Sequence, residues 1–125
     1  MTPVIAVVDD DISVRESLES LIRSVGMSVK LFASAEEFLD SAHLGKTDCL
    51  ILDVRLPGMS GIELHRRLLD SSRGRPVVFM TAHGFDDRAR SEAASDWTVA
   101  CLTKPFGEDE LLDAVQAALK WKPSA

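Results

Sequence analysis

The chain has 125 residues, of which 46% are hydrophobic and 27% charged, so its length and composition indicate one globular domain rather than a disordered or fibrous protein. A net charge of −6 disfavours non-specific binding to nucleic acid or to an anionic membrane, and two cysteines are too few for a secreted disulfide scaffold. The longest apolar runs have about five residues, against the ~20 that span a membrane, and no signal-peptide pattern opens the chain, so we expect a cytoplasmic protein.

Five short apolar runs alternate with amphipathic stretches along the chain. Four of the runs are almost entirely apolar, which is typical of strands buried on both faces of a parallel sheet. The second run contains a lysine within an alternating pattern, so we expect it at an edge of the sheet. In chain order the runs are Val4–Val8, Val29–Phe32, Cys49–Leu52, Pro76–Met80 and Val99–Leu102.

The stretches between the runs carry apolar residues at helical spacing. Three of them open with Ser-x-x-Glu, the pattern of an N-terminal capping box, in which both side chains satisfy free backbone N–H groups. These boxes are Ser13–Glu16, Ser34–Glu37 and Ser60–Glu63. Gly26 is expected to end the first helix. A fourth helix is predicted at roughly Asp86–Ser95, and a fifth has apolar residues at helical spacing from Leu111 onward. Strands that alternate with helices predict an α/β fold with a five-stranded parallel sheet and helices on both faces.

Polar residues follow four of the runs, at the points where the predicted strands end. These residues are Asp9, Asp10 and Asp11 after the first run, Asp53 after the third, Thr81 after the fourth and Lys104 after the fifth. In an open parallel sheet the ligand crevice lies outside the carboxyl ends of the strands, so these side chains should converge on one edge. Each alone has a simpler interpretation, such as a helix cap for Asp11, and the prediction rests on the coincidence of all four strand ends.

Converging carboxylates repel one another unless a cation lies between them. Mg²⁺ is a hard ion that binds one or two carboxylates together with waters and a phosphate. A carboxylate beside Mg²⁺, a lysine and a threonine can accept a phosphoryl group, because the cations and the hydroxyl bind the phosphate oxygens while the carboxylate attacks in line. The pattern therefore favours phosphoryl transfer onto an aspartate.

The chain resembles a two-component response-regulator receiver domain, a CheY-like domain, over essentially its whole length. The segments that carry the resemblance are Val7–Asp11, Asp53–Gly61, Met80–Ala82 and Lys104–Phe106, and Phe32–Leu39 resembles the FixJ-type subgroup. The resemblance implies a flavodoxin-like, doubly wound α/β sandwich with strand order 2-1-3-4-5 and five helices. It also implies a receiver domain at residues 1–121, followed by a tail or the start of a linker at 122–125.

The resemblance implies a role for each matching residue. Asp53 would accept a phosphoryl group from a sensor histidine kinase and lose it by slow self-catalysed hydrolysis, so the domain would not be an enzyme that turns over a metabolite. The ligands of Mg²⁺, or of Mn²⁺ in its place, would be Asp10, Asp53, the main-chain carbonyl of Arg55 and, through water, Asp9. The phosphate-binding residues would be Thr81, Ala82 and Lys104, and the Lys104–Pro105 peptide bond would be cis.

Two departures from the family pattern lie before Lys104. The position three before this lysine usually holds a tyrosine or phenylalanine that turns inward when the threonine moves, and here it is Cys101. Thr81 and Cys101 would then form an altered switch, with the phosphate chemistry retained. The interval from Thr81 to Lys104 is 23 positions, one longer than the family spacing. We hypothesise that Trp97 packs over the space beside Cys101, with a partly exposed loop tryptophan as the alternative.

The remaining cysteine and histidine residues show no ligand pattern. One strand would separate the strands of Cys49 and Cys101, which is too far for a disulfide, so we expect two free core thiols. His43, His65 and His83 have no metal-ligand spacing and are predicted to be polar surface residues.

Output would pass through the face formed by the fourth helix, fifth strand and fifth helix. It would reach a downstream effector or a C-terminal DNA-binding domain that regulates transcription, as in FixJ-type relatives, with phosphorylation-dependent homodimerisation as a hypothesis. The domain itself would bind neither membrane nor nucleic acid.

Three alternatives remain beside the signalling switch. A haloacid-dehalogenase-type phosphohydrolase would use Asp9-x-Asp11, but the chain lacks a cap domain and a pair of acids after a strand beyond Lys104. A protein-interaction module would keep the fold without phosphorylation. A flavodoxin-like FMN carrier is disfavoured because no Ser/Thr/Gly-rich phosphate loop follows the first run.

Overall fold

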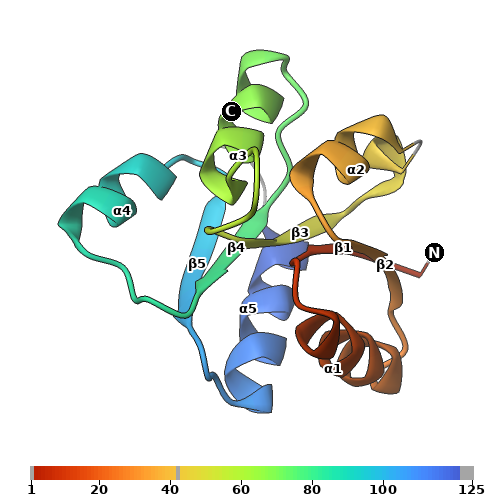
Figure 1. Cartoon of the computed structure of the whole chain (residues 1–125). Coiled ribbons are helices and arrows are strands. Elements are labelled where there is room, and N and C mark those ends of the chain that lie inside the picture. Colours follow the sequence, from red (N-terminus) through yellow and green to blue (C-terminus); the bar gives the residue numbers. More distant parts are fainter. Residues whose placement is uncertain (1, 42, 122–125) are drawn as a thin grey trace.

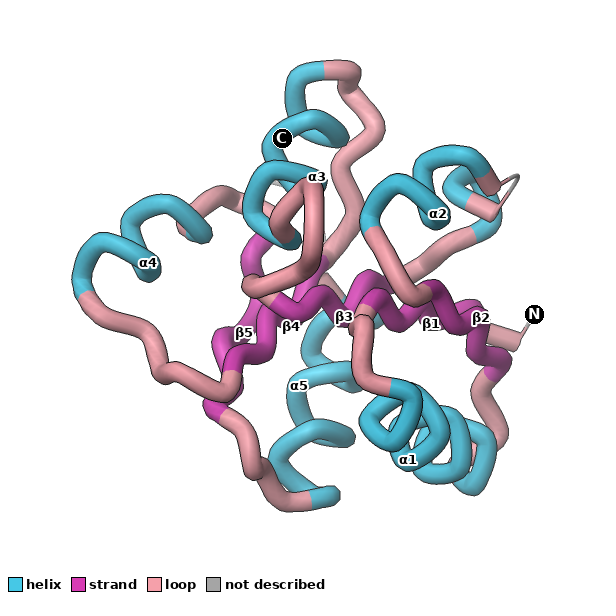
Figure 2. Tube along the Cα trace, viewed as in Figure 1, coloured by secondary structure: helices cyan, strands magenta, loops and turns pink. Residues whose placement is uncertain are grey.

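The computed structural model of the chain describes residues 2–41 and 43–121, and within these ranges five parallel strands form one sheet (Figures 1 and 2). The strands are β1 (Val4–Val8), β2 (Ser28–Phe32), β3 (Cys49–Asp53), β4 (Val77–Thr81) and β5 (Thr98–Thr103). Their order is β2-β1-β3-β4-β5, so the predicted fold class and topology are confirmed, and β2 lies at an edge as its lysine indicated. The predicted tail at 122–125 lies outside the described residues.

Helices cover both faces of the sheet. They are α1 (Ile12–Ser24), α2 (Ala35–Asp40), α3 (Gly61–Asp70), α4 (Asp87–Ala93) and α5 (Glu108–Lys120), with a short 3₁₀ helix η1 (Leu44–Lys46) before β3. Figure 1 shows α1 and α5 on one face and α2, α3 and α4 on the other. Among the residues that the structure describes, none of these helices is long and apolar enough to cross a membrane.

The core consists of two apolar clusters, one on each face of the sheet. Because successive side chains of a strand point to opposite faces, Ile5 and Val7 join the cluster under α1 and α5, while Ala6 and Val8 join the cluster under α2, α3 and α4. All four of these side chains are fully buried. Because β1 is buried on both faces, its sequence, Val4–Val8, is continuously apolar and does not alternate between apolar and polar residues.

The helix starts follow two of the three predicted capping boxes. Ser34 and Ser60 cap α2 and α3, and each hydroxyl accepts a hydrogen bond from a backbone N–H three residues on, at 3.0 Å. The box at Ser13 is wrong: α1 begins at Ile12, and the carboxylate of Asp11 caps it by accepting from the Ser13 N–H at 2.8 Å. An aspartate is as good a cap as a serine, and it adds a negative charge at the positive end of the helix.

The fourth predicted helix is shorter in the structure than the sequence indicated. It covers Asp87–Ala93, with Asp86 as its cap and Ala94 already extended, rather than Asp86–Ser95. Ala93 is its buried residue, so little apolar contact holds a longer helix against the sheet. At the end of α1, Gly26 has φ of 85° and ends that helix as predicted.

The pairing of β4 and β5 contains a bulge at the start of β5. Val77 pairs with Thr98 but Val78 pairs with Ala100, so Val99 has no partner of its own in β4. Beyond the bulge the register is regular as far as the last pair of the two strands, and the Lys104 N–H donates to the Thr81 carbonyl at 2.8 Å. The bulge lies at the start of β5, and the pairing of Thr81 with Thr103 at the carboxyl end of the strands is regular.

Candidate functional site

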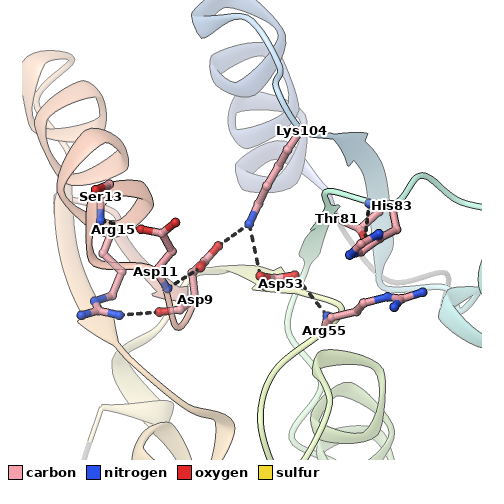
Figure 3. Close-up of polar contacts among 9 residues, drawn as sticks. All are labelled: Asp9, Asp11, Ser13, Arg15, Asp53, Arg55, Thr81, His83 and Lys104. Carbon is pink, nitrogen blue, oxygen red and sulfur yellow. Dashed lines mark hydrogen bonds and ion pairs between the residues drawn. The ribbon is translucent and has the colours of Figure 1, made fainter.

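Two carboxylates and one ammonium meet at the carboxyl edge of the sheet (Figure 3). Asp9 follows β1, Asp53 ends β3, and Lys104 follows β5. The Nζ atom of Lys104 lies 2.7 Å from Oδ2 of Asp9 and 3.2 Å from Oδ2 of Asp53. Asp9 is fully buried, and Asp53 is 6% exposed. The sequence prediction that these strand ends converge is therefore correct for these three side chains.

Backbone N–H groups orient both carboxylates. Oδ1 of Asp9 accepts from the Asp11 N–H at 2.8 Å, and Oδ1 of Asp53 accepts from the Arg55 N–H at 3.1 Å. Each aspartate thus uses one oxygen to close a turn after its strand and presents the other to Lys104. This arrangement directs the negative charge of both residues toward the same point.

Arg15 also supports this edge, and the sequence analysis did not identify it. From the first turn of α1, its guanidinium donates to the main-chain carbonyl of Asp9 at 2.7 Å. The bond ties the turn after β1 to the helix that follows. An arginine six positions after an aspartate does not form a motif, so this contact could not be predicted from the sequence.

Close contact between β3 and α3 requires a glycine at position 61. A Cβ atom there would overlap the main-chain carbonyl oxygen of Asp53. The Gly61 N–H donates to the Val54 carbonyl at 3.1 Å, so the chain folds back on the end of β3 directly after the site. Gly61 therefore allows the N-terminus of α3 to approach Asp53.

The charges at this edge are not balanced. Burial raises the pKa of the Asp53 carboxyl, and the negative charge of Asp9 raises it further against the opposing effect of Lys104. Burial lowers the pKa of the Lys104 ammonium, but its bond to Asp9 and the charge of Asp53 outweigh this, so its pKa is raised. Two carboxylates sharing one ammonium leave the site with an excess of negative charge that a further cation would neutralise.

The same carboxylates offer ligands to a metal ion. Asp9, Asp10 and Asp53 each present an oxygen within 4.8 Å of the others, and Asp10 is exposed. Carboxylate oxygens are the ligands of hard divalent ions such as Mg²⁺, so the donor set fits that ion and not a thiolate-bound metal. The main-chain carbonyl of Arg55 was the other predicted metal ligand. Arg55 lies two residues after Asp53, and its side chain is exposed.

The predicted phosphate-binding residues lie around this site. Thr81 ends β4, next to β3 in the sheet, and is 2% exposed; its Oγ1 accepts from the His83 N–H at 3.2 Å. Figure 3 shows Thr81 and Lys104 with Asp53 between them. Ala82 follows as an exposed residue, and the Lys104–Pro105 peptide bond is cis.

Cys101 lies on the face of the sheet that α4 covers, half-buried against the apolar cluster there. Cys49 is fully buried in the cluster on the other face. Both thiols are free, as predicted, but only Cys49 is a core residue. Burial raises the pKa of the Cys49 thiol to about 12, so it is an inert packing residue.

The hypothesis that Trp97 covers Cys101 is wrong. Trp97 lies in the turn before β5, and its ring packs on Trp121 with centroids 4.5 Å apart. A Cβ atom at Gly74 would lie 2.9 Å from Nε1 of Trp97, so this ring also borders the α3–β4 loop. The alternative interpretation, a partly exposed loop tryptophan, describes it better.

His65 is buried, which contradicts its predicted place on the surface. It is 1% exposed on α3, and its Nε2 lies 2.7 Å from the Ser95 hydroxyl oxygen. Its ring meets Phe79 edge-on with centroids 5.5 Å apart. Burial lowers the pKa of the His65 imidazole to about 4, helped by the charge of Arg66, so the ring is neutral. His83 is exposed as predicted, and His43 is half-buried.

Comparison with known proteins places the chain among signalling domains. A model of the response regulator receiver domain matches residues 5–116. The chain is 45% identical over 120 residues to response regulator protein TodT of Pseudomonas putida, covering 96% of this chain and 52% of the relative. The chain therefore spans about half the length of such relatives.

Solved structures agree with this result. The structure of response regulator StyR matches with a TM-score of 0.83 and 46% sequence identity, over 96% of this chain and 60% of that one. The crystal structure of FixJ-N matches with a TM-score of 0.84 and 32% identity, over 100% of this chain and 99% of that one.

Proposed function

The chain belongs to the response regulator receiver domain family, and from this premise we propose that Asp53 is its phosphorylated residue and that a histidine kinase supplies the phosphoryl group. The observation that carries the proposal is the contact of Lys104 with both Asp53 and Asp9 at the carboxyl edge of the sheet. Receiver domains of response regulators are generally not enzymes, so we assign no metabolite substrate.

The reaction follows from the orientation of Asp53. Its Arg55-bonded Oδ1 holds the carboxylate in place, and the other oxygen, Oδ2, attacks phosphorus as the phosphorus–nitrogen bond of a phosphohistidine breaks, with the bonding electrons leaving on the imidazole nitrogen. Lys104 would then bind a phosphate oxygen, as would the Thr81 hydroxyl and the Ala82 N–H. A bound Mg²⁺, held by Asp10, Asp53 and the Arg55 carbonyl and, through water, by Asp9, would supply positive charge for the remaining oxygens.

The signal would leave the site through Thr81. If its hydroxyl turns to the phosphate, the Oγ1 that now accepts from the His83 N–H is drawn away, and the loop before α4 must adjust. Cys101 lacks the ring that usually follows this movement, so α4 itself would carry the change to the α4–β5–α5 face. An effector, a further domain of a longer protein, or a second copy of the chain would read it there.

Mass spectrometry of the intact protein tests the proposal. The wild-type chain, mixed with Mg²⁺ and a small phosphodonor such as acetyl phosphate, should gain the mass of one phosphoryl group. Asp53→Asn should gain none, and neither should the wild type in excess chelator. A modified Asp53→Asn protein, or a wild type that stays unmodified with every donor and with a purified kinase, would contradict the proposal.

Size-exclusion chromatography tests the dimer separately. Mg²⁺ with beryllofluoride, a mimic of the phosphoryl group, should shift the elution of the wild type and not of Asp53→Asn. Unchanged elution of the wild type would exclude phosphorylation-dependent dimerisation and leave the phosphorylation site itself unaffected.

A further inference from the structure

A carboxylate outside the phosphorylation site contacts the loop that joins Asp53 to α3. Glu36 lies in the first turn of α2, and its Oε2 accepts from the Met59 backbone N–H at 3.1 Å. The same oxygen lies over Gly58, whose φ is +74°, and a Cβ atom at that glycine would be 2.5 Å from it. The glutamate therefore fits against a bare stretch of backbone, where no side chain intervenes.

The β3–α3 loop comprises residues 54–60. Its first residue, Val54, donates its N–H to the Met80 carbonyl in β4 at 2.9 Å and accepts from the Gly61 N–H at 3.1 Å, so the start of the loop is held apart from Glu36. In the part of the chain that the structure describes, the bond from Met59 to Glu36 is the only hydrogen bond that ties residues 55–59 to an element other than β3 or α3. Leu56 and Met59 bury their side chains in the cluster under α2 and α3, which anchors the side chains of the loop. On the backbone of this stretch, Glu36 holds the Met59 N–H at the far end of the loop from Asp53.

The interaction uses a charged acceptor. The Met59 N–H is the largest of the effects that lower the pKa of the Glu36 carboxyl, so Glu36 is ionised at neutral pH. Hydrogen bonds to a charged group are shorter and stronger than neutral ones, and a backbone donor adds little entropy cost on its side. Glu37, the next residue, instead accepts from the Ala33 N–H at 3.3 Å and does not contact the loop.

We propose that Glu36 is a positioning residue for the phosphorylation site. By holding the β3–α3 loop, it fixes the place of the Arg55 carbonyl relative to Asp53, and so sets the affinity of the site for a divalent cation. The inference rests on the proposed function, in which that carbonyl is a ligand. Glu36 acts through the loop and touches neither phosphate nor metal.

Magnesium titration by calorimetry, with hydrogen exchange of the Met59 amide measured by NMR, tests the proposal. Glu36→Ala should raise the Mg²⁺ dissociation constant about three- to tenfold, as expected for one lost hydrogen bond, and should speed exchange at Met59. Glu36→Asp keeps the charge but shortens the side chain, so it should resemble Glu36→Ala. Glu36→Gln keeps an oxygen at the right distance and should recover most of the affinity.

Glu37→Gln is the matched control, because it removes one negative charge from the same turn of α2. It should leave both the magnesium affinity and the Met59 exchange unchanged. If Glu36→Gln binds as weakly as Glu36→Ala and Glu36→Asp binds normally, the effect is one of charge and the positioning role is wrong. If exchange at Met59 rises in Glu36→Ala while the affinity stays the same, the loop does not set the site.

If the proposed phosphorylation of Asp53 is itself wrong, the experiments give a different result. A wild-type chain that binds no Mg²⁺, or that gains no phosphoryl group, would overturn the assignment of the site before any Glu36 variant is compared. Glu36 is exposed, so its variants should keep the wild-type circular dichroism spectrum, which shows that a changed affinity does not come from unfolding.

Discussion

The two ends of the sheet differ in how regularly β4 and β5 pair. At the carboxyl end, Asp9, Asp53 and Lys104 meet within hydrogen-bonding distance, and the register of β4 and β5 is regular. At the amino end, Val99 bulges out of β5 and Trp97 packs on Trp121. An added residue at the carboxyl end would turn a side chain away from the site, because strand side chains alternate between faces.

The amino end has its own stabilising contacts in place of a site. The His65 ring bonds Ser95, whose hydroxyl oxygen lies 3.2 Å from that of Thr98, and Thr98 donates to the Ala93 carbonyl. The single hydroxyl proton of Thr98 goes to the Ala93 carbonyl, so the Thr98 hydroxyl oxygen accepts the proton of the Ser95 hydroxyl. The Ser95 oxygen then accepts from Nε2 of His65. The histidine therefore carries its proton on Nε2, and this chain of bonds ties α3 to the segment before β5.

Removal of the ammonium at the carboxyl end should have the largest effect on stability. Lys104→Met leaves the buried Asp9 and Asp53 carboxylates facing each other without a cation, which should cost about 3 kcal/mol of unfolding free energy at neutral pH. Mg²⁺ should restore much of this loss, since it binds the same oxygens. Urea unfolding with and without Mg²⁺ measures both effects. If, in the absence of Mg²⁺, Lys104→Met is as stable as the wild type, the ion pair does not stabilise this edge.

The His65 network at the amino end predicts a dependence of stability on pH. The folded-state pKa, about 4, lies below the ordinary 6.5, so the unfolded chain binds the proton more tightly. The stability that His65 contributes is therefore complete above pH 6.5 and is lost as the pH falls toward 4, by about 3 kcal/mol. In urea unfolding from pH 7.5 to 4, His65→Asn should lose this component of the pH dependence. Parallel curves for the two proteins would contradict the assignment.

The tryptophan pair should have the smallest effect. Trp121→Ala removes one ring from a half-exposed pair and should lower the unfolding free energy by about 1 kcal/mol. Because the pair lies at the end of the sheet away from Asp53, phosphorylation from a small donor should proceed at the wild-type rate. A large loss of phosphorylation in Trp121→Ala would show that the two ends are coupled.

Local chemistry in the sequence determined the strands, the edge position of β2 and the residues at the carboxyl edge. Apolar runs indicate burial on both faces of a parallel sheet. The polar residues that follow four of the runs must lie at the same edge of the sheet whatever the detailed packing.

Only the tertiary structure decided where single side chains outside these runs would lie. His65 is buried because Phe79 and Ser95 come against the same side of α3, and Trp97 meets Trp121 because α5 ends beside the turn before β5. Glu36 contacts the β3–α3 loop across 23 positions of sequence. Such contacts depend on which elements pack together, and a single residue carries no periodic pattern from which that packing could be predicted.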